Sequence, residues 1–479
     1  LAGIDALDSR LQSLVQESPR PAALGAAQLA LAATVAADLA QRPVLLTDAT
    51  PAARRAVAGA AAGRVERRLF VLREADLPAD AADRAEIAAL WRRDALLSHA
   101  CLLLELEDGP REPVAVPRLE PFLEALGGPL LLAAGEPRSL ALPRLARHAI
   151  PAPSREELRR LHGGDAREAD AWARLVEHFP LDLDAAADLL ARHPADEGRW
   201  QATRNDRRRN LDGLAQRVVP AAGWDDLVLP ADSLRLLHDI ARQVRLRHRV
   251  HGDWGFAARG SRGLGVSALF AGPSGVGKTL AAEVLAGELA LDLYRIDLAA
   301  VVSKYIGETE KNLSRIFNAA EESGAVLLFD EADALFGKRS EVRDSHDRYA
   351  NLEVAYLLQR MEAYRGLAIL TTNQRQALDD AFLRRLALVV NFPFPAARER
   401  AEIWRRAFPP AAPVGDLDYG RLARLAVAGG NIRNIALGAA FIAAERGEPI
   451  AMAHIAEAAR SEYAKLERSP GDIDLGGAP

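Results

Sequence analysis

The chain has 479 residues, enough for about three domains, and 49% of them are hydrophobic, which is typical of a soluble globular protein. Its 61 Lys and Arg against 66 Asp and Glu give a net charge of −5, which excludes a global basic field for nucleic acid or anionic membranes but not a local basic patch. The lone Cys101 excludes an intrachain disulfide framework and suits a reducing compartment. No apolar run approaches the about 20 residues of a membrane span and no signal peptide is visible, so we expect a cytoplasmic protein without membrane contacts. Because the sequence begins with Leu1 and not with Met, we expect further residues before it.

The first half alternates short apolar runs with stretches of helical character, such as 21–41, 81–98 and 117–125. This alternation predicts a parallel α/β sheet. The apolar runs with strand character are 44–47, 69–72, 100–106, 130–134 and 146–150.

The second half repeats this layout after a helix predicted over 231–249. Between strand centres, the first two gaps are roughly 25 and 33 residues in both halves, which indicates a duplicated unit. In each half the last strand leads through a Pro-x-Pro sequence into a charged helix, predicted over 154–161 and 396–406. The strand candidates of the second half are 266–271, 293–298, 325–330, 367–372 and 387–392.

A complete phosphate-binding motif follows the strand predicted over 266–271. The sequence GPSGVGKT satisfies G-x-x-x-x-G-K-[ST], in which glycines let backbone N–H groups curl toward an oxyanion ahead of a helix N-terminus. We expect Lys278 to reach the β- and γ-phosphates of ATP and the Thr279 hydroxyl to ligate Mg²⁺. The alternative is a glycine-rich turn that only joins a strand to a helix. The predicted nucleotide-binding residues of this segment are Gly272, Pro273, Ser274, Gly275, Val276, Gly277, Lys278, Thr279 and Leu280.

The first half lacks this chemistry. After the strand predicted over 44–47 the residues are DATPAARR, with no glycine and no Gly-Lys-Ser/Thr, so the acids of LLLELED at 102–108 have no phosphate-bound Mg²⁺ to hold. We therefore interpret 20–205 as a nucleotide-silent copy of the second half, against the alternative of an unrelated α/β domain. The basic segment RNDRRRN at 204–210 is interpreted as a solvated interdomain linker, with a nucleic-acid contact as the alternative.

Polar residues stand at the ends of two strands of the second half. In AVLLFDEAD, Asp330 is expected to hold Mg²⁺ through water and Glu331 to act as general base for the attacking water. Asn373, at the tip of the strand 367–372, can orient that water or, alternatively, cap the following turn. Farther on, Arg384 and Arg385 can stabilise charge on the γ-phosphate of a neighbouring subunit, and an intrachain salt bridge is the alternative.

Together these motifs resemble those of the AAA ATPases, over about 224–459. By that resemblance 272–279 is Walker A, 327–331 is Walker B, Asn373 is sensor 1, and Arg384 and Arg385 are arginine fingers. The segment SKYIGETEK resembles pore loop 1 of the spastin and katanin group, in which Lys304, Tyr305 and Ile306 would grip an extended polypeptide; local packing of Tyr305 is the alternative. The segment 337–348 would be the second, charged pore loop.

The resemblance also implies a fold and an assembly. The family has a five-stranded parallel sheet with a C-terminal α-helical lid, and it forms rings, usually hexamers, with ATP and Mg²⁺ at the subunit interfaces. In GGNIRNI, Arg433 resembles a sensor 2 residue that reaches ATP when the lid closes, although spastin-type proteins usually have small residues there and Arg433 can instead be structural. We expect a lead-in at 1–19, the degenerate copy at 20–205, the α/β subdomain at 206–395, the lid at 396–465 and a tail at 466–479.

A closer likeness joins the segments WGFAARGSRGLGVSALFAGPSGVGKT, DLYRIDLAAVVSKYIGETEKNL and DEADALFGKRSEVRDSHDRYAN to bacterial AAA ATPases encoded with extracellular contractile injection systems. The leading hypothesis is an ATP-driven motor that acts on a protein substrate, which can be an injection-system component. The second is an assembly scaffold in which ATP fixes ring formation. The third, a nucleic-acid motor, is disfavoured by the net charge and by the lack of a recognisable binding module.

Overall fold

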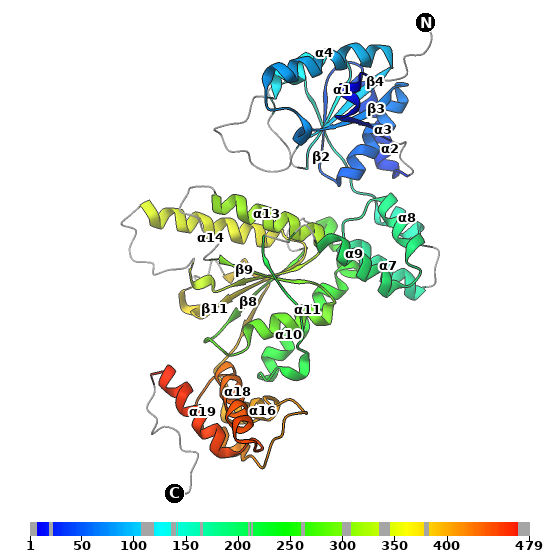
Figure 1. Cartoon of the computed structure of the whole chain (residues 1–479). Helices are drawn as coiled ribbons and strands as arrows, with labels where there is room; N and C mark the ends of the chain where they lie inside the picture. Colours follow the sequence, from blue (N-terminus) through cyan, green and yellow to red (C-terminus); the bar gives the residue numbers. More distant parts are fainter. Residues whose placement is uncertain are drawn as a thin grey trace. The chain divides into compact units, whose positions relative to one another are not determined.

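The computed structural model describes residues 7–18, 23–106, 119–135, 140, 142–162, 166–208, 211, 214–259, 264–298, 308–334, 345–377 and 383–467. The chain divides into two compact units, Leu1–Thr203 and Arg204–Pro479, and each has a central sheet flanked by helices (Figure 1).

All ten strands predicted from the sequence are present, and each unit adds a short edge strand that the sequence did not indicate. The strands of the first unit are β1 (Val15–Glu17), β2 (Val44–Thr47), β3 (Arg68–Arg73), β4 (Ala100–Glu105), β5 (Leu130–Ala133) and β6 (Ala146–Ala149). Those of the second unit are β7 (Gln216–Val218), β8 (Val266–Ala271), β9 (Leu293–Asp297), β10 (Val326–Asp330), β11 (Leu367–Thr372) and β12 (Leu388–Asn391). The segment 1–19, expected as a helical lead-in, therefore also contributes a strand, β1.

Within the described residues, each sheet has six strands, of which five run parallel and one edge strand runs antiparallel. The first sheet has the order β1-β3-β4-β5-β2-β6, and the second, taken from its β7 edge, has the order β7-β9-β10-β11-β8-β12. The two orders match strand for strand. This match confirms the predicted α/β fold, in which one unit precedes a second unit of the same design.

Helices cover both faces of the first sheet. Side chains of successive strand residues point to opposite faces, so Leu45 packs in the core under α4 while Val44 and Leu46 pack in the core under α2 and α3. Cys101 lies fully buried in the second of these cores, and burial raises the pKa of its thiol to about 12, in keeping with a purely hydrophobic role. The helices of the first unit are α1 (Ser9–Gln12), α2 (Ala26–Leu39), α3 (Pro51–Arg64), α4 (Ala81–Leu97), α5 (Glu120–Leu126), α6 (Arg155–Arg160), α7 (Ala166–His178), α8 (Leu183–Arg192) and, across the boundary, α9 (Asp196–Arg207).

In the second unit α13 and α14 lie on one face of the sheet and α10 and α11 on the other (Figure 1). The C-terminal helices form a small domain around their own apolar core, which includes Trp404, Ile432 and Ile455. This domain corresponds to the predicted lid. The helices are α10 (Ala231–Arg247), α11 (Lys278–Leu289), α13 (Glu308–Ser323), α14 (Ser345–Ala363), α16 (Ala397–Arg406), α17 (Tyr419–Leu422), α18 (Gly429–Arg446) and α19 (Met452–Lys465).

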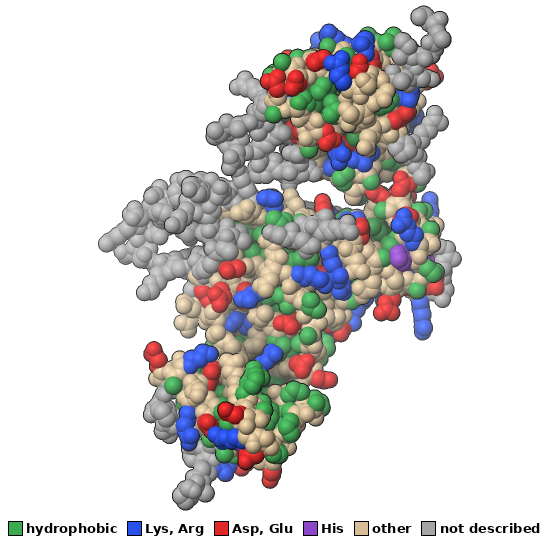
Figure 2. Space-filling model, viewed as in Figure 1, with side chains coloured by type: hydrophobic (Ala, Val, Ile, Leu, Met, Phe, Trp, Pro, Cys, Tyr) green, Lys and Arg blue, Asp and Glu red, His purple; other side chains and the backbone are tan. Residues whose placement is uncertain are grey.

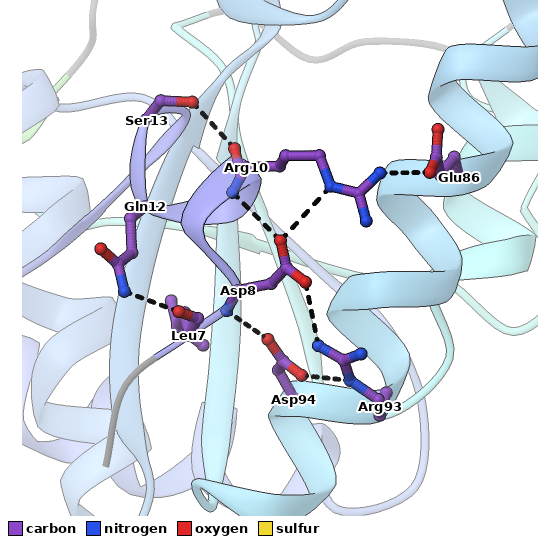
Figure 3. A network of polar contacts seen from close by, with 8 residues as sticks. All are labelled: Leu7, Asp8, Arg10, Gln12, Ser13, Glu86, Arg93 and Asp94. Carbon is purple, nitrogen blue, oxygen red and sulfur yellow. Dashed lines mark hydrogen bonds and ion pairs between the residues drawn. The ribbon is translucent and has the colours of Figure 1, made fainter. Parts of the chain in front are cut away.

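A polar network fastens the start of the first unit to α4 (Figure 3). Asp8 caps α1 by accepting a hydrogen bond from the backbone N–H of Arg10, and its own N–H donates to Asp94 over 2.7 Å. Arg93 donates to both carboxylates, over 3.3 Å to Asp8 and 2.6 Å to Asp94. The guanidinium of Arg10 also reaches Glu86 of α4. These contacts place β1 beside β3 and so complete the edge of the first sheet.

Part of the basic segment at 204–210 is packed and not freely solvated, contrary to our expectation. Asp292, which is 5% exposed, pairs with Arg204 and Arg217 over 3.4 Å each. Arg208 binds both of its oxygens, over 2.8 and 3.1 Å. Since Asp292 directly precedes β9, the segment is fixed to the second sheet.

The surface has no uniform sign of charge on the face shown in Figure 2, where acidic and basic side chains are interspersed over each unit. Among the described helices, none is both long enough and apolar enough to cross a bilayer.

Candidate active site

The loop between β8 and α11 is shaped by glycines at positions where a side chain does not fit. A Cβ atom on Gly272 would lie 2.0 Å from the carbonyl oxygen of Phe392, and Gly277 has φ +100°, in the region that favours glycine. The loop therefore passes close to β12 and turns sharply into α11, whose first residue is Lys278. This is the strand, turn and helix context that the phosphate-binding motif requires.

Lys278 is held at the centre of the site. Its side-chain Nζ donates hydrogen bonds to the carbonyl oxygens of Gly272 and Pro273, over 2.6 and 2.8 Å, and to Oδ1 of Asn373 over 2.8 Å. Burial lowers the pKa of this ammonium, while the charges of Asp330, Asp333 and Glu331 act in the opposite direction. The predicted cation, amide and acids therefore gather around one point at the carboxyl edge of the sheet.

Asp330 ends β10 and is 9% exposed. Its Oδ1 accepts hydrogen bonds from the Thr371 hydroxyl, over 2.5 Å, and from the backbone N–H of Glu331, over 3.2 Å. Glu331 is exposed and has φ +54°, a left-handed conformation that is costly for a residue with a side chain. Glu331 therefore lies in an exposed turn directly after the strand.

Asn373 is tied to the same acids from the neighbouring strand. Its backbone N–H donates to Oδ2 of Asp333 over 2.9 Å, and the hydroxyl of Thr372 donates to the other oxygen of Asp333. The side-chain oxygen of Asn373 accepts the hydrogen bond from Lys278, and the following turn is capped by the Thr372 hydroxyl, which accepts from the backbone N–H of Gln374 over 3.0 Å. Thr371, Thr372 and Asp333 were not predicted as site residues. The sequence does carry a signal for them, because two threonines and an asparagine end one strand and several acids end another.

The oxygen donors present fit Mg²⁺. Mg²⁺ is usually held by one or two protein oxygens together with phosphate oxygens and water, and Thr279 and Asp330 offer a hydroxyl and a carboxylate of this kind. Among the residues that the structure describes, no three His, Cys, Asp or Glu side chains form a group that could hold a metal ion by themselves. This is compatible with an ion that arrives bound to ATP.

The lid contacts the phosphate-binding loop directly. The backbone N–H of Gly430, in the first turn of α18, donates to the carbonyl oxygen of Gly275 over 2.8 Å, and a Cβ on Gly430 would lie 3.3 Å from the Cα of Gly275. Arg433 is exposed one turn later, and its charge lowers the pKa of Glu283 in α11, although burial raises that pKa overall.

The other predicted residues lie partly outside the described region. Arg384 and Arg385 are exposed, and Nε of Arg385 lies 3.7 Å from a carboxylate oxygen of Glu362, a long and weak ion pair. Lys304, Tyr305 and Ile306 lie outside the described residues, as does most of the second predicted pore loop at 337–348.

In the first unit an ion pair lies at the corresponding edge of the sheet. The loop from β2 to α3 is short, and Arg54 donates from α3 to the carbonyl oxygen of Ala49 over 3.2 Å. Arg55 forms a two-fold ion pair with Glu105 at the end of β4, over 2.5 and 2.7 Å. By strand order β4 corresponds to β10, so Glu105 stands where the second unit has Asp330. In each unit an arginine pairs with this carboxylate: Arg55 of α3 with Glu105, and Arg295 of β9 with Asp330 over 2.8 Å.

A glycine-shaped loop ahead of a helix, with paired acids on a neighbouring strand, defines the second unit as a phosphate-loop nucleotide-binding domain. Residues 268–394 match the model of the ATPase family associated with various cellular activities (AAA). The match supports ATP hydrolysis as the activity of this domain.

The chain is similar to proteins that carry the same domain. An AAA family ATPase of Sinorhizobium fredii is 34% identical over 186 residues, which is 38% of this chain and 54% of that protein. The 26S proteasome regulatory subunit 10B homolog A of Arabidopsis thaliana is 33% identical over 184 residues, 36% of this chain and 46% of that protein. The proteasome-activating nucleotidase of Aeropyrum pernix is 31% identical over 213 residues, 42% of this chain and 52% of that protein. The chain thus spans about half the length of these curated relatives.

Proposed function

We propose that this chain hydrolyses Mg²⁺-bound ATP within a ring of identical subunits, a hexamer, and thereby remodels, assembles or loads a protein substrate through a central pore. The observation that carries the ATPase part is the convergence of Lys278, Asn373 and the acids after β10 at one edge of the sheet. Bound ATP would accept contacts from the loop N–H groups and Lys278, Glu331 would take the proton of the attacking water, and Asn373 would orient that water.

Three features support the assembly and the substrate. Arg384 and Arg385 are exposed, as residues that serve the pocket of a neighbouring subunit must be. Two of the relatives are named for proteasomes, which favours a protein substrate for this chain as well. The sequence likeness of 303–311 to a pore loop makes Tyr305 the residue that grips the substrate, and the likeness to injection-system ATPases makes a component of such a system its candidate.

The test separates a motor from an assembly scaffold. Oligomeric state is measured by light scattering with and without Mg²⁺ and ATP, and ATP turnover is measured with and without an unfolded polypeptide. A motor forms a ring whose turnover is stimulated by the polypeptide, and Tyr305→Ala removes the stimulation while the ring persists. Slow turnover that is indifferent to Tyr305→Ala, in a ring that still needs ATP to form, would establish the scaffold. Stimulation by single-stranded DNA alone would point to the nucleic-acid motor.

A further inference from the structure

Both oxygens of the Asp330 carboxylate are engaged, by different parts of the sheet. Oδ1 is held by the Thr371 hydroxyl and the backbone N–H of Glu331, as described above. Oδ2 lies 2.8 Å from a terminal guanidinium nitrogen of Arg295. Oδ2, which accepts no hydrogen bond from Thr371 or from the backbone of Glu331, is therefore the oxygen that pairs with Arg295.

Arg295 reaches this oxygen from an unusual position. It lies in the middle of β9, between the buried residues Tyr294 and Ile296, and pairs in register with Leu328, two residues before Asp330. Its side chain must run along the sheet, about 3.3 Å per residue, to arrive at the edge. Asp330 is the carboxylate with which Arg295 pairs, and no role for Arg295 was predicted from the sequence.

The two side chains of this ion pair differ in their exposure to solvent. The carboxylate side chain of Asp330 is 12% exposed, whereas the side chain of Arg295 is 42% exposed. The guanidinium can therefore leave Asp330 by turning into water, without burying an unpaired charge. The carboxylate cannot move as easily, because Thr371 and the backbone hold its other oxygen.

We propose that Arg295 is a positioning residue that holds Asp330 before nucleotide binds and competes with Mg²⁺ for Oδ2, so that Arg295 sets the Mg²⁺ concentration at which ATP binds tightly. The proposal rests on the proposed function, since it requires an Mg²⁺-ATP site at Asp330. The physical reason is repulsion between two cations, the guanidinium and the hydrated Mg²⁺. When one of them is bound to the Asp330 carboxylate, the carboxylate has a lower affinity for the other. Removing the guanidinium removes the competitor.

The experiment titrates free Mg²⁺, starting from excess chelator, against the binding of a fluorescent non-hydrolysable ATP analogue to the full chain. For a half-exposed ion pair we expect Arg295→Ala to lower the Mg²⁺ midpoint about two- to five-fold. Arg295→Lys, which restores the charge but not the planar fork, should return the midpoint toward the wild-type value. Arg242→Ala is the matched control, because it removes a similar exposed pair, with Asp239 over 2.8 Å, from α10.

An unchanged or higher midpoint in Arg295→Ala would overturn the proposal. Weaker analogue binding in chelator would do so as well, because it would mean that Arg295 contacts the nucleotide. If Arg295→Ala fails to fold, Arg295→Gln tests the same point, with thermal unfolding as the check on both variants. Failure of the proposed function looks different: the wild-type chain would then bind no analogue at any Mg²⁺ concentration, or Lys278→Ala would bind it equally well.

Discussion

Nζ of Lys278 and Oδ1 of Asn373 lie 2.8 Å apart, so that the first residue of α11 and the tip of β11 share one hydrogen bond. The same ammonium is also held by two loop carbonyls. These acceptors satisfy a buried cation in the part of the site where phosphate oxygens are expected. We therefore expect ATP to replace them, and the Asn373 side chain to become available to a water molecule.

This relationship separates the effects of the two residues. Lys278→Ala should abolish ATP binding, because the phosphates lose their only predicted side-chain cation on the loop. Asn373→Ala should leave ATP binding nearly unchanged and slow hydrolysis about 10²-fold, the scale for losing one oriented polar group in a transition state. Binding is measured by calorimetry and hydrolysis by phosphate release. Retained tight binding in Lys278→Ala would contradict the assignment of the loop.

Glu331→Gln tests the general base. The amide has the shape of the carboxylate, and Gln has the same backbone cost as Glu at this positive φ. The amide cannot, however, accept the proton of the attacking water. We expect ATP to bind normally and hydrolysis to slow by about 10² to 10⁴, the range for loss of a general base. Measurement of single-turnover hydrolysis checks this. Hydrolysis at the wild-type rate would transfer the role to another acid, and Asp333, two residues farther along the chain, is the candidate.

Arg385→Ala tests whether an arginine completes the site of a neighbouring subunit. A pure assembly of this variant should bind ATP but lose hydrolysis by about 10³ or more. Mixing it with Lys278→Ala subunits should restore part of the activity, since each variant supplies what the other lacks. Arg384→Ala, treated in the same way, shows which of the two arginines carries the effect.

The ion pair between Arg385 and Glu362 provides the control for this experiment. At 3.7 Å, and with side chains that are 50% and 31% exposed, the pair contributes little to stability. Glu362→Ala should therefore leave hydrolysis unchanged. If Glu362→Ala reproduces the loss seen in Arg385→Ala, or if mixing restores nothing, the arginine acts within its own chain.

Most of the fold could be predicted because its strands are short, apolar and regularly spaced. Buried parallel strands such as β8 and β11 are continuous hydrophobic runs, and their predicted bounds agree with the structure. The edge strands β1 and β7 were missed because an edge strand of three residues, half exposed, has no apolar pattern to detect. Their position depends on contacts with distant residues, such as those between Asp8 and Asp94.

The site could be predicted to the extent that its chemistry is local in sequence. A phosphate loop is one continuous segment, so its residue types suffice. The partners of Asp330 come from β9 and β11, and no role was predicted for either Arg295 or Thr371. Such pairs follow from strand order and register, which become visible only in the folded sheet.

The arginine cluster on Asp292 leads to the last prediction, which concerns stability. Asp292 is nearly buried, and among the described residues Arg204, Arg208 and Arg217 surround its carboxylate. Asp292→Ala leaves these cations without their shared anion, and desolvation already lowers the pKa of Arg204. Because the arginines are partly exposed, we expect a loss of about 2 kcal/mol, below the full cost of breaking a buried pair.

Urea unfolding of the full chain measures this loss. Two units can unfold in separate transitions, and the transition of the second unit is the one that Mg²⁺ and ATP shift to higher urea, because a ligand stabilises the unit that binds it. Asp292→Ala should lower the midpoint of that transition and leave the other unchanged. Asp239→Ala, which breaks an exposed pair with Arg242, should lower it far less. Equal effects of the two variants would mean that the cluster contributes no more to stability than an ordinary surface ion pair.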